Sequence, residues 1–405
     1  MVYQHFMLSG VGSTKPLDLA TYLIGAGHEV TVICGRGYLS QGLDVPPGLI
    51  EWLEVKGIRV LCLGVDYRQQ MSFLRRIWAF ISFTCLAMLM VLRLPQFDVL
   101  LASSTPLTVG LIGLVTRYVR RRPWVFELRD LWPYYPVRAG FLKNRLLIAL
   151  CTFFENWFYR DATAITAISQ RMCDYLVARG ISPQKITFIP TGVDLETSLK
   201  EGADLDWWRQ RGWGDCLRVV YMGAHGRVNG LQFLVEAAAR LGPKEGIKLV
   251  LVGDGAEKPR LVAEAKDRKL EQIIFHPPVK RECVPGILKA ADVGLMIERV
   301  TPGSELCMPN KFFDYLAAGL PIISNNPAEY WEHIRAAECG LLADHNRPES
   351  LVELLRQLRD NPRLRQEMRR RALALAQQRF DRRQLNREWE EVLLKAAGKE
   401  EVRED

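Results

Sequence analysis

Two carboxylates and a lysine beside a predicted helix start carry the most specific chemistry in the sequence. Pro309 and Asn310 are typical of a helix start, and Lys311 places a cation in the first turn. A helix start directs its amide groups and its dipole toward an anion. Glu305 precedes this helix, and Asp314 lies three residues after Lys311 on the same face. Because a carboxylate accepts paired hydrogen bonds from hydroxyl groups, we expect a site for an anionic ligand that also carries sugar or ribose hydroxyls.

Two glycine-rich loops in the second half of the chain follow predicted strands. They are residues 223–230 (GAHGRVNG) and 253–255 (GDG), and glycine permits close approach of the backbone to a ligand. His225, Arg227 and Lys258 are cations near enough in sequence to compensate phosphate charge. For each of them taken alone, a solvated loop residue is the simpler interpretation.

The front half has a related loop, residues 9–16 (SGVGSTKP). Its glycines and the helix predicted after it suit a phosphate, but a tight turn uses the same residues. The full GxGxxG fingerprint of dinucleotide-binding enzymes is absent, because Lys15 occupies the place of the third glycine. The loop therefore disfavours a nicotinamide oxidoreductase.

The elements that must position these residues are visible as short apolar runs that alternate with stretches long enough for helices. That alternation favours right-handed βαβ crossovers and parallel sheets. In the front half the predicted strands are 29–34, 58–63, 99–102, 124–128, 164–168 and 186–189, after a first strand at the start of the chain. In the second half they are 217–222, 247–252, 273–276, 293–297 and 321–324.

The two series of strands predict an α/β protein with two Rossmann-like, doubly wound domains. A polar stretch over 190–206 has linker composition. We expect one domain over 1–194 and another over 195–379, with a final helix of about 380–405 packing back on the first. Two such domains facing across a cleft would bind ligands at the carboxyl ends of their strands.

Several motifs along the chain share a pattern with a known family. These motifs are 27–32 (GHEVTV), 186–194 (ITFIPTGVD), 253–255 (GDG), 291–293 (ADV) and 309–319 (PNKFFDYLAAG). Over nearly its whole length the sequence resembles the family-4 retaining glycosyltransferases, which have the GT-B fold. Residues 103–106 (SSTP) and 127–133 (ELRDLWP) are similar to the bacterial subgroup that builds O-antigen and capsule repeat units, such as L-fucosamine transferases.

This resemblance implies a retaining glycosyltransferase of bacterial surface polysaccharide synthesis. The first domain would bind a lipid-linked glycan acceptor, and the second a nucleotide-sugar donor, such as a UDP-N-acetylamino sugar. Glu305 would hold sugar hydroxyls and Asp314 the ribose, with Lys311 on the diphosphate. The implied catalytic residues are Glu305, Lys311, Asp130 and Arg129. The implied donor-binding residues are Gly12, Gly223, His225, Arg227, Gly253, Lys258, Val279, Asn310 and Asp314.

The chain departs from the family pattern at several of these positions. The paired acids are commonly two glutamates eight positions apart, whereas Glu305 and Asp314 are nine apart. The usual Arg and Lys after the first donor-domain strand fall on Ala224 and Asn229, and Arg129 replaces a frequent histidine. The shorter Asp314 would shift the ribose contact, and Arg227 or His225 would take the place of the two cations.

No metal or cofactor is expected. In this fold, helix dipoles and Lys or Arg residues stabilise the leaving diphosphate in place of a metal. The Asp-x-Asp pair at 204–206 lies in the linker, where helix capping is the simpler interpretation. Asp130 would orient or deprotonate an acceptor hydroxyl, and an ion pair with Arg129 explains it equally well.

The front half has features of a membrane-surface protein. Residues 1–195 carry 20 Lys and Arg against 13 Asp and Glu, most of the net charge of +8. The run 77–92 is uncharged, bordered by arginines, and at 16 residues is just short of a span. A buried crossover helix and a membrane-surface helix both fit it, and the surface helix is favoured, with Trp78, Phe80 and Phe83 in the membrane. The stretch 146–159 could join that surface.

Composition sets the remaining limits. At 48% hydrophobic and 25% charged residues, the chain is an ordinary globular protein, and its basic residues form no nucleic-acid-binding module. Nine scattered cysteines and no secretory leader favour the cytoplasm. We therefore expect a cytoplasmic enzyme, peripheral on the inner face of the cell membrane. The alternatives are a non-catalytic GT-B scaffold partner of another transferase and a transferase that uses a GDP-sugar.

Overall fold

The computed structural model describes residues 1–8, 14–40, 43–67, 71–138, 140, 142–306 and 308–399. Gly12, expected in the donor site, lies outside these ranges. The chain divides into two compact units. Unit 1 comprises Met1–Pro190 and Arg383–Asp405, and unit 2 comprises Thr191–Arg382. The boundary lies four residues before the one expected from the sequence, and the helical end of the chain belongs to unit 1.

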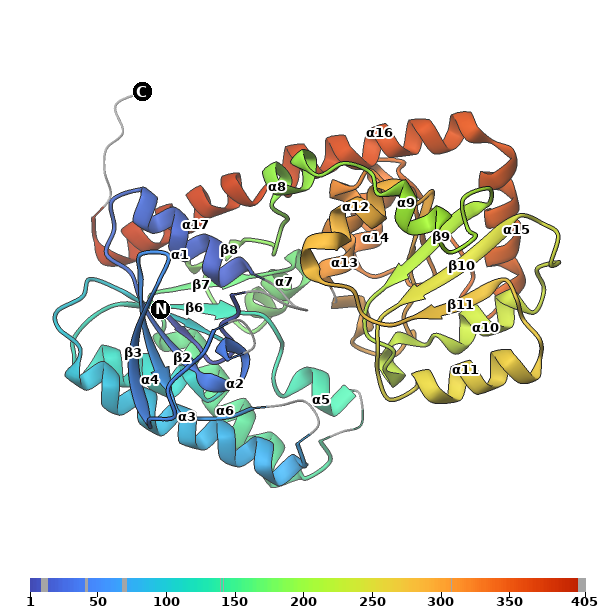
Figure 1. Cartoon of the computed structure of the whole chain (residues 1–405). Coiled ribbons are helices and arrows are strands. Elements are labelled where there is room, and N and C mark those ends of the chain that lie inside the picture. Colours follow the sequence, from blue (N-terminus) through green and yellow to red (C-terminus); the bar gives the residue numbers. More distant parts are fainter. Residues whose placement is uncertain are drawn as a thin grey trace. The chain divides into compact units, whose positions relative to one another are not determined.

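Unit 1 is built on an eight-stranded sheet in the order β3-β4-β2-β1-β5-β6-β7-β8 (Figure 1). All neighbouring strands are parallel except β3, which pairs antiparallel with β4. The strands are β1 (Val2–Tyr3), β2 (Thr31–Gly35), β3 (Ile50–Val55), β4 (Ile58–Leu63), β5 (Leu100–Ser103), β6 (Trp124–Leu128), β7 (Ala164–Ala167) and β8 (Ile186–Phe188).

Helices cover both faces of this sheet. Helix α4 contacts both α3 and α6, whereas α1 packs with the chain's last helix, α17, in one apolar core (Figure 1). The helices are α1 (Lys15–Gly25), α2 (Arg36–Leu39), α3 (Phe73–Arg93), α4 (Val109–Tyr118), α5 (Tyr134–Arg138), α6 (Arg145–Asp161), α7 (Gln170–Ala178) and α17 (Arg382–Ala397).

Helix α17 is held to unit 1 by apolar and polar contacts. Trp389 is fully buried in the core that α1 and the sheet also form. On the same helix, the Glu390 carboxylate accepts a hydrogen bond from the Tyr22 hydroxyl at 2.8 Å and lies 2.8 Å from Nε2 of His28. The returning helix is therefore part of the first unit's core.

Unit 2 has a six-stranded, fully parallel sheet in the order β11-β10-β9-β12-β13-β14. Its strands are β9 (Leu217–Met222), β10 (Ile247–Val252), β11 (Ile273–His276), β12 (Val293–Met296), β13 (Ile322–Ser324) and β14 (Gly340–Leu342). Its helices are α8 (Leu195–Lys200), α9 (Leu205–Arg209), α10 (Gln232–Ala238), α11 (Lys258–Asp267), α12 (Val284–Ala290), α13 (Asn310–Ala317), α14 (Glu329–Ala336), α15 (Pro348–Asp360) and α16 (Pro362–Arg379).

Alternating strand residues of unit 2 enter two separate cores. Val220 and Val250 pack with α12, α13 and α16, whereas Val219 and Leu249 pack with α10, α11 and α15. Both faces of the strands are therefore apolar, which explains why the strands read as continuous hydrophobic runs.

Helix α3 extends beyond both ends of the uncharged run 77–92. Within the described residues, Leu74–Arg93 is the one helix that is long and apolar enough to cross a membrane, judged by length and composition. A core helix packed on a sheet passes the same test. Phe83, Ala87 and Val91 are fully buried on one side of α3, so this helix packs along the unit.

Candidate functional site

The strand order of unit 2 reverses between β9 and β12. Ligands of doubly wound sheets bind at such a switch point, beyond the carboxyl ends of the strands. Here the loops after the two strands are joined, because the Arg299 amide donates to the Val228 carbonyl at 2.9 Å. A Cβ at Gly230 would lie 2.9 Å from that amide nitrogen, so glycine is required for this approach.

The two glycine loops predicted from the sequence meet at this edge. A Cβ at Gly253 would lie 1.9 Å from the Gly223 carbonyl oxygen, and one at Gly255 would lie 2.5 Å from that of His225. These glycines therefore allow the loops after β9 and β10 to pack on each other. The structure thus gives these glycines a structural role, which is the close contact between the two loops.

His225 does not provide the cation that the sequence suggested. Its side chain is fully buried, and neither ring nitrogen has a hydrogen-bond partner among the described residues. Burial, with the nearby Lys258 ammonium, lowers the imidazole pKa to about 4, although Asp254 acts in the opposite direction. The ring is therefore neutral at pH 7, and the expectation of a phosphate-compensating charge is wrong.

The other expected donor-loop residues have structural partners. The Lys258 ammonium donates to the carbonyls of Gly253 at 2.6 Å and His276 at 2.9 Å, which ties two strand ends together. Arg227 is mostly exposed and lies 3.6 Å from Glu257. Val279 packs against the apolar core of the unit.

Lys311 lies where the sequence analysis expected an anion site. It is in the first turn of α13, and its side chain is 9% exposed. Its ammonium is 4.0 Å from the Glu298 carboxylate and 4.7 Å from the centroid of the Tyr221 ring. Because Tyr221 is the penultimate residue of β9 and Glu298 follows β12, the lysine is at the switch point.

Glu298 is a site residue that the sequence analysis missed. Its side chain is 11% exposed, and its carboxylate accepts a hydrogen bond from the Asn326 amide at 3.1 Å. Its backbone amide and carbonyl both bond to the Asn325 side chain. Its position in the sequence could have identified it, because an acidic residue that directly follows the buried run 293–297 must lie at the carboxyl edge of the sheet.

Helix α13 is locked onto the sheet by Tyr315. The Tyr315 hydroxyl accepts a hydrogen bond from the Met222 amide at 2.9 Å, and a Cβ on Gly294 would lie 2.8 Å from its ring. Asn310 is the first residue of the helix, directly before Lys311. The helix start is therefore fixed relative to the ends of β9 and β12.

The two expected carboxylates have different surroundings. Asp314 receives a two-pronged bond from the Arg281 guanidinium at 2.8 and 2.6 Å. Glu305 lies in a short 3-10 turn, and its carboxylate accepts a hydrogen bond from the Gly303 amide at 2.7 Å. Arg281 is a further cation beside α13 that the sequence analysis did not single out.

The carboxyl edge of unit 1 holds Arg129 and Asp130, directly after β6. The Asp130 carboxylate accepts a hydrogen bond from the Thr105 hydroxyl at 2.7 Å, and the Arg129 amide donates to the Ser104 hydroxyl at 2.9 Å. The order of the sheet reverses between β1 and β5, so these contacts lie beside the switch point of this unit. No ion pair joins Arg129 to Asp130 in the described part of the chain.

A buried ion pair supports this edge. The Lys15 ammonium lies 2.8 Å from the Glu127 carboxylate, and both side chains are almost fully enclosed. Burial alone raises the pKa of Glu127, but Lys15 and Arg129 outweigh it and bring that pKa to about 2. Lys15, which in sequence stands in place of a glycine, is the first residue of α1 and joins that helix to β6.

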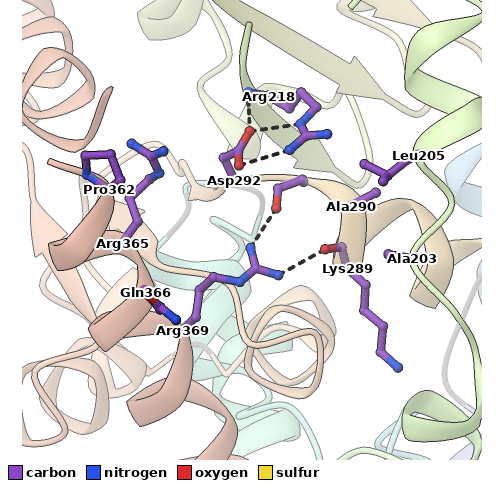
Figure 2. Close-up of a pocket in the computed structure, with 11 residues that line it drawn as sticks. Ala203, Leu205, Arg218, Lys289, Ala290, Asp292, Pro362, Arg365, Gln366 and Arg369 are labelled. Atoms are coloured by element: carbon purple, nitrogen blue, oxygen red, sulfur yellow. Dashed lines mark hydrogen bonds and ion pairs between the residues drawn. The ribbon is translucent and has the colours of Figure 1, made fainter. Parts of the chain in front are cut away.

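The cavity drawn in Figure 2 lies at the opposite edge of unit 2. It measures about 290 Å³ and is lined by several cations. Arg218, near the start of β9, pairs with Asp292, and Arg369 donates to the carbonyls of Ala291 and Lys289 (Figure 2). Arg218 and Arg369 therefore have structural partners at the start of two strands and at the end of a helix. The cavity lies at the amino ends of the strands, whereas ligands of such sheets bind at the carboxyl ends.

The described residues contain no group of three or more His, Cys, Asp or Glu side chains that could hold a metal ion. The Asp204 carboxylate accepts a hydrogen bond from the Trp207 amide at 2.9 Å and so caps α9. Asp204 therefore has the capping role that was the simpler interpretation of its motif.

Comparison with known proteins supports the same division. Residues 12–192 match the model of the glycosyl transferase 4-like domain, and residues 210–374 match that of glycosyl transferases group 1. The colanic acid biosynthesis glycosyl transferase WcaI of Escherichia coli K12 is 28% identical over 184 residues, which cover 45% of each protein. The matched region thus spans less than half of that relative.

Two solved structures show the same fold. Sucrose-phosphate synthase from Thermosynechococcus elongatus aligns with a TM-score of 0.77 and 16% identity, over 98% of both chains. Anabaena HepE, solved with UDP-glucose, aligns with a TM-score of 0.69 and 17% identity, over 97% of this chain and 98% of that one. With the two family models matched in sequence to its two units, the chain belongs to the family-4 glycosyltransferases of GT-B fold.

Proposed function

We propose that the chain is a retaining glycosyltransferase that moves a sugar from a nucleotide diphosphate sugar to a lipid-linked glycan in bacterial surface polysaccharide synthesis. The observation that carries this proposal is Lys311, an enclosed cation in the first turn of α13 at the switch point of unit 2. A UDP-N-acetylamino sugar is the proposed donor. The name of WcaI supports the polysaccharide, and the UDP-glucose bound to HepE supports the uridine nucleotide.

The chemistry requires stabilisation of a departing nucleoside diphosphate. Lys311 and the amides at the start of α13 would neutralise its developing charge without a metal. Glu305 would accept hydrogen bonds from sugar hydroxyls, and Asp314, oriented by Arg281, would accept them from the ribose. Glu298 holds Lys311 at the edge until the diphosphate arrives.

Unit 1 would bind the acceptor at its own switch point. Asp130, oriented by Thr105, is placed at the carboxyl edge of the sheet, where it would orient an acceptor hydroxyl. Arg129 lies beside it and contributes positive charge. The acceptor hydroxyl attacks the anomeric carbon, the bond from that carbon to the diphosphate breaks, and the hydroxyl proton leaves with the diphosphate.

The proposed location is the inner face of the cell membrane. Two exposed apolar rows support it. The outer stripe of α3 comprises Leu74, Trp78, Ile81, Cys85, Leu89 and Leu92. The outer stripe of α6 comprises Leu146, Leu150, Phe153 and Trp157. Both rows follow helical spacing on unit 1, the half of the chain that carries the excess positive charge.

Nucleotide-sugar binding and transfer test this function. Thermal unfolding is measured with UDP-N-acetylglucosamine, UDP-glucose, GDP-mannose and dTDP-glucose, and donor hydrolysis is followed by release of nucleotide. We expect a UDP-sugar to raise the melting temperature most and to be hydrolysed slowly. If the protein binds a nucleotide sugar but neither hydrolyses nor transfers it, the non-catalytic scaffold is favoured. If GDP-mannose alone raises the melting temperature, the donor carries guanosine and not uridine.

A further inference from the structure

Three aromatic side chains from separate segments, each following a strand, meet at the carboxyl edge of unit 1. His5 follows β1, Tyr38 lies in α2 after β2, and Tyr67 follows β4. The ring centroids of His5 are 4.9 Å from Tyr38 and 4.6 Å from Tyr67, and the two tyrosines are 6.3 Å apart and nearly parallel. The three strands are neighbours in the sheet, so the cluster belongs to the edge at which a doubly wound domain binds ligands.

The backbone fixes this cluster in place. A Cβ at Gly37 would lie 2.6 Å from both the amide nitrogen and the carbonyl oxygen of Tyr67, so α2 packs directly on that residue. Phe80 of α3 stacks on Tyr67 with centroids 5.3 Å apart and planes at 21°. Tyr67 is thus nearly buried between them, whereas His5 and Tyr38 keep part of their surface exposed.

Fixed positive charge surrounds these rings. The Arg76 guanidinium lies 5.7 Å from the centroid of Tyr67. Burial, with Arg129 and Arg76, lowers the pKa of His5 to about 4, so the imidazole is neutral between two permanent cations. In the described part of the chain, Nδ1 of His5 and Nε of Arg76 are enclosed without a hydrogen-bond partner. Leaving such groups unpaired in the interior is unfavourable, and a ligand that bonds to them would remove that cost.

The same arginine is at the start of the helix that carries the outer stripe. Arg76 is in the first turn of α3, two residues from both Leu74 and Trp78. It therefore lies on the side of the helix from which Phe80 stacks on Tyr67, and not on the outer stripe itself. The rings and the cation are thus on the inner side of the start of α3, and the exposed apolar stripe is on its outer side. A molecule with a sugar, a phosphate group and a hydrocarbon chain presents the same three kinds of chemistry, with the hydrocarbon passing around the first turn of α3 to the stripe.

We propose that His5, Tyr38 and Tyr67, with Arg76, form the subsite for the membrane-proximal sugar and the diphosphate of a polyprenyl diphosphate-linked acceptor. The C–H face of the sugar packs on the exposed parts of His5 and Tyr38, which the buried Tyr67 supports, and the diphosphate binds Arg76. The hydrocarbon lies along the outer stripe of α3. This inference rests on the proposed function, because it assigns the acceptor of that reaction to named residues.

Measurements of direct acceptor binding test this subsite independently of the transferase activity. The probes are farnesyl diphosphate linked to N-acetylglucosamine, glucose or galactose, with farnesyl diphosphate, farnesyl phosphate and phosphatidylglycerol liposomes as comparisons. We expect at least one sugar-linked probe to bind the wild type tenfold more tightly than farnesyl diphosphate. Tyr38→Ala should remove that gain, whereas Tyr38→Phe should keep it. Arg76→Gln should remove the preference for diphosphate over monophosphate, and Arg76→Lys should restore part of it.

Trp52→Ala is the matched control, because Trp52 is a 55% exposed aromatic residue of unit 1 on the edge strand β3. It should bind every probe as the wild type does, and all variants should keep wild-type thermal unfolding and UDP-sugar binding. Tight binding of the probes to Tyr38→Ala and Arg76→Gln would overturn the subsite. A second result would also overturn it. If Arg76→Gln reduces binding to liposomes, and the sugar-linked probes bind the wild type no more tightly than farnesyl diphosphate, then Arg76 binds lipid headgroups and not the acceptor diphosphate. Absence of transfer with intact probe binding would instead contradict the proposed function.

Discussion

Lys311 combines the three properties that a leaving-group cation needs. It is in the first turn of a helix, its side chain is enclosed, and it lies at the switch point of unit 2, 4.0 Å from the Glu298 carboxylate. We expect Lys311→Ala and Glu305→Gln each to lower turnover by about 10² or more, roughly 3 kcal/mol of lost transition-state stabilisation. Arg209→Ala, which removes a mostly exposed cation of α9 in the same unit, is the control and should change turnover little. Near-normal turnover of a folded variant would remove that residue from the mechanism.

Glu298 is expected to act through Lys311. Glu298→Gln removes the charge that holds the ammonium, so we expect kcat to fall about tenfold in the wild-type background. In the Lys311→Ala background the same change should have less than a twofold effect, because residues that share one interaction are not additive. Steady-state kinetics of the two single variants and the double variant measure this coupling. Equal effects in both backgrounds would mean that Glu298 contacts the substrate itself.

The absence of a metal requirement is a separate expectation about the site residues. If Lys311 and the start of α13 neutralise the diphosphate, activity should persist in excess EDTA. The measurement is the transfer rate with EDTA and with added Mg²⁺ or Mn²⁺. Loss of the rate in EDTA and its recovery with either ion would show that the leaving group needs a cation that the chain does not supply.

The sequence alone was sufficient to identify several residues of the site, but not their charge or their ion-pair partners. The spacing of Lys311 and Asp314 placed both on one helix beside the switch point, because helix starts and strand ends follow local rules. The charge of His225 and the Arg281 partner of Asp314 depend on burial and on contacts between distant segments. No local pattern contains that information.

At the scale of elements, α1 and β6 are joined by the buried pair of Lys15 and Glu127. We expect Lys15→Met to destabilise the protein by about 3 kcal/mol, because it leaves a buried carboxylate unpaired. A double variant, Lys15→Met with Glu127→Leu, should recover much of the loss, since apolar pairs commonly replace buried ion pairs without penalty. Urea unfolding followed by tryptophan fluorescence measures both. A double variant as unstable as the single one would mean that packing rather than charge is lost.

The same pair predicts a dependence on pH. The folded-state pKa of Glu127, about 2, lies below the ordinary value of 4.5, so its stabilising contribution is present above pH 4.5 and is lost as the pH falls toward 2. The unfolding free energy of the wild type, measured relative to that of the double variant, should therefore fall as the pH is lowered through this range. A difference that stays constant from pH 6 to pH 3 would contradict the lowered pKa.

Most strands of both sheets were predictable, because central parallel strands are continuous apolar runs. The runs at 58–63, 124–128 and 217–222 coincide with β4, β6 and β9. Strand β3 was missed, although 50–55 alternates and the turn residues Lys56 and Gly57 both have positive φ. An antiparallel edge strand alternates apolar and polar residues, whereas the buried parallel strands are continuous apolar runs. Strand β14 is three residues long and too short for any periodicity.

At the scale of the whole molecule, charge and apolar surface gather on the same unit. The first 195 residues carry most of the net positive charge, and unit 1 carries both outer stripes. Most of Trp78 and Leu146 is in solvent, at 70% and 83% exposed. The sequence expectation that Phe83 would face the membrane is wrong, because it is fully buried, and Phe80 stacks on Tyr67. The run alone could not show which side of the helix faces the sheet.

Peripheral membrane binding should therefore depend on the outer stripe of α3. We expect the wild type to sediment with phosphatidylglycerol liposomes at low salt and to be partly released at high salt. Each basic residue near an anionic surface adds about 1 kcal/mol, which salt screens, whereas burial of apolar side chains persists. Changing Leu74, Trp78 and Ile81 together to Ser should abolish most binding. The matched control changes three exposed apolar residues of unit 2, Val228, Val262 and Leu342, to Ser and should bind as the wild type does. If the wild type stays in the supernatant at low salt, or if both triple variants lose binding equally, the stripe is not a membrane surface.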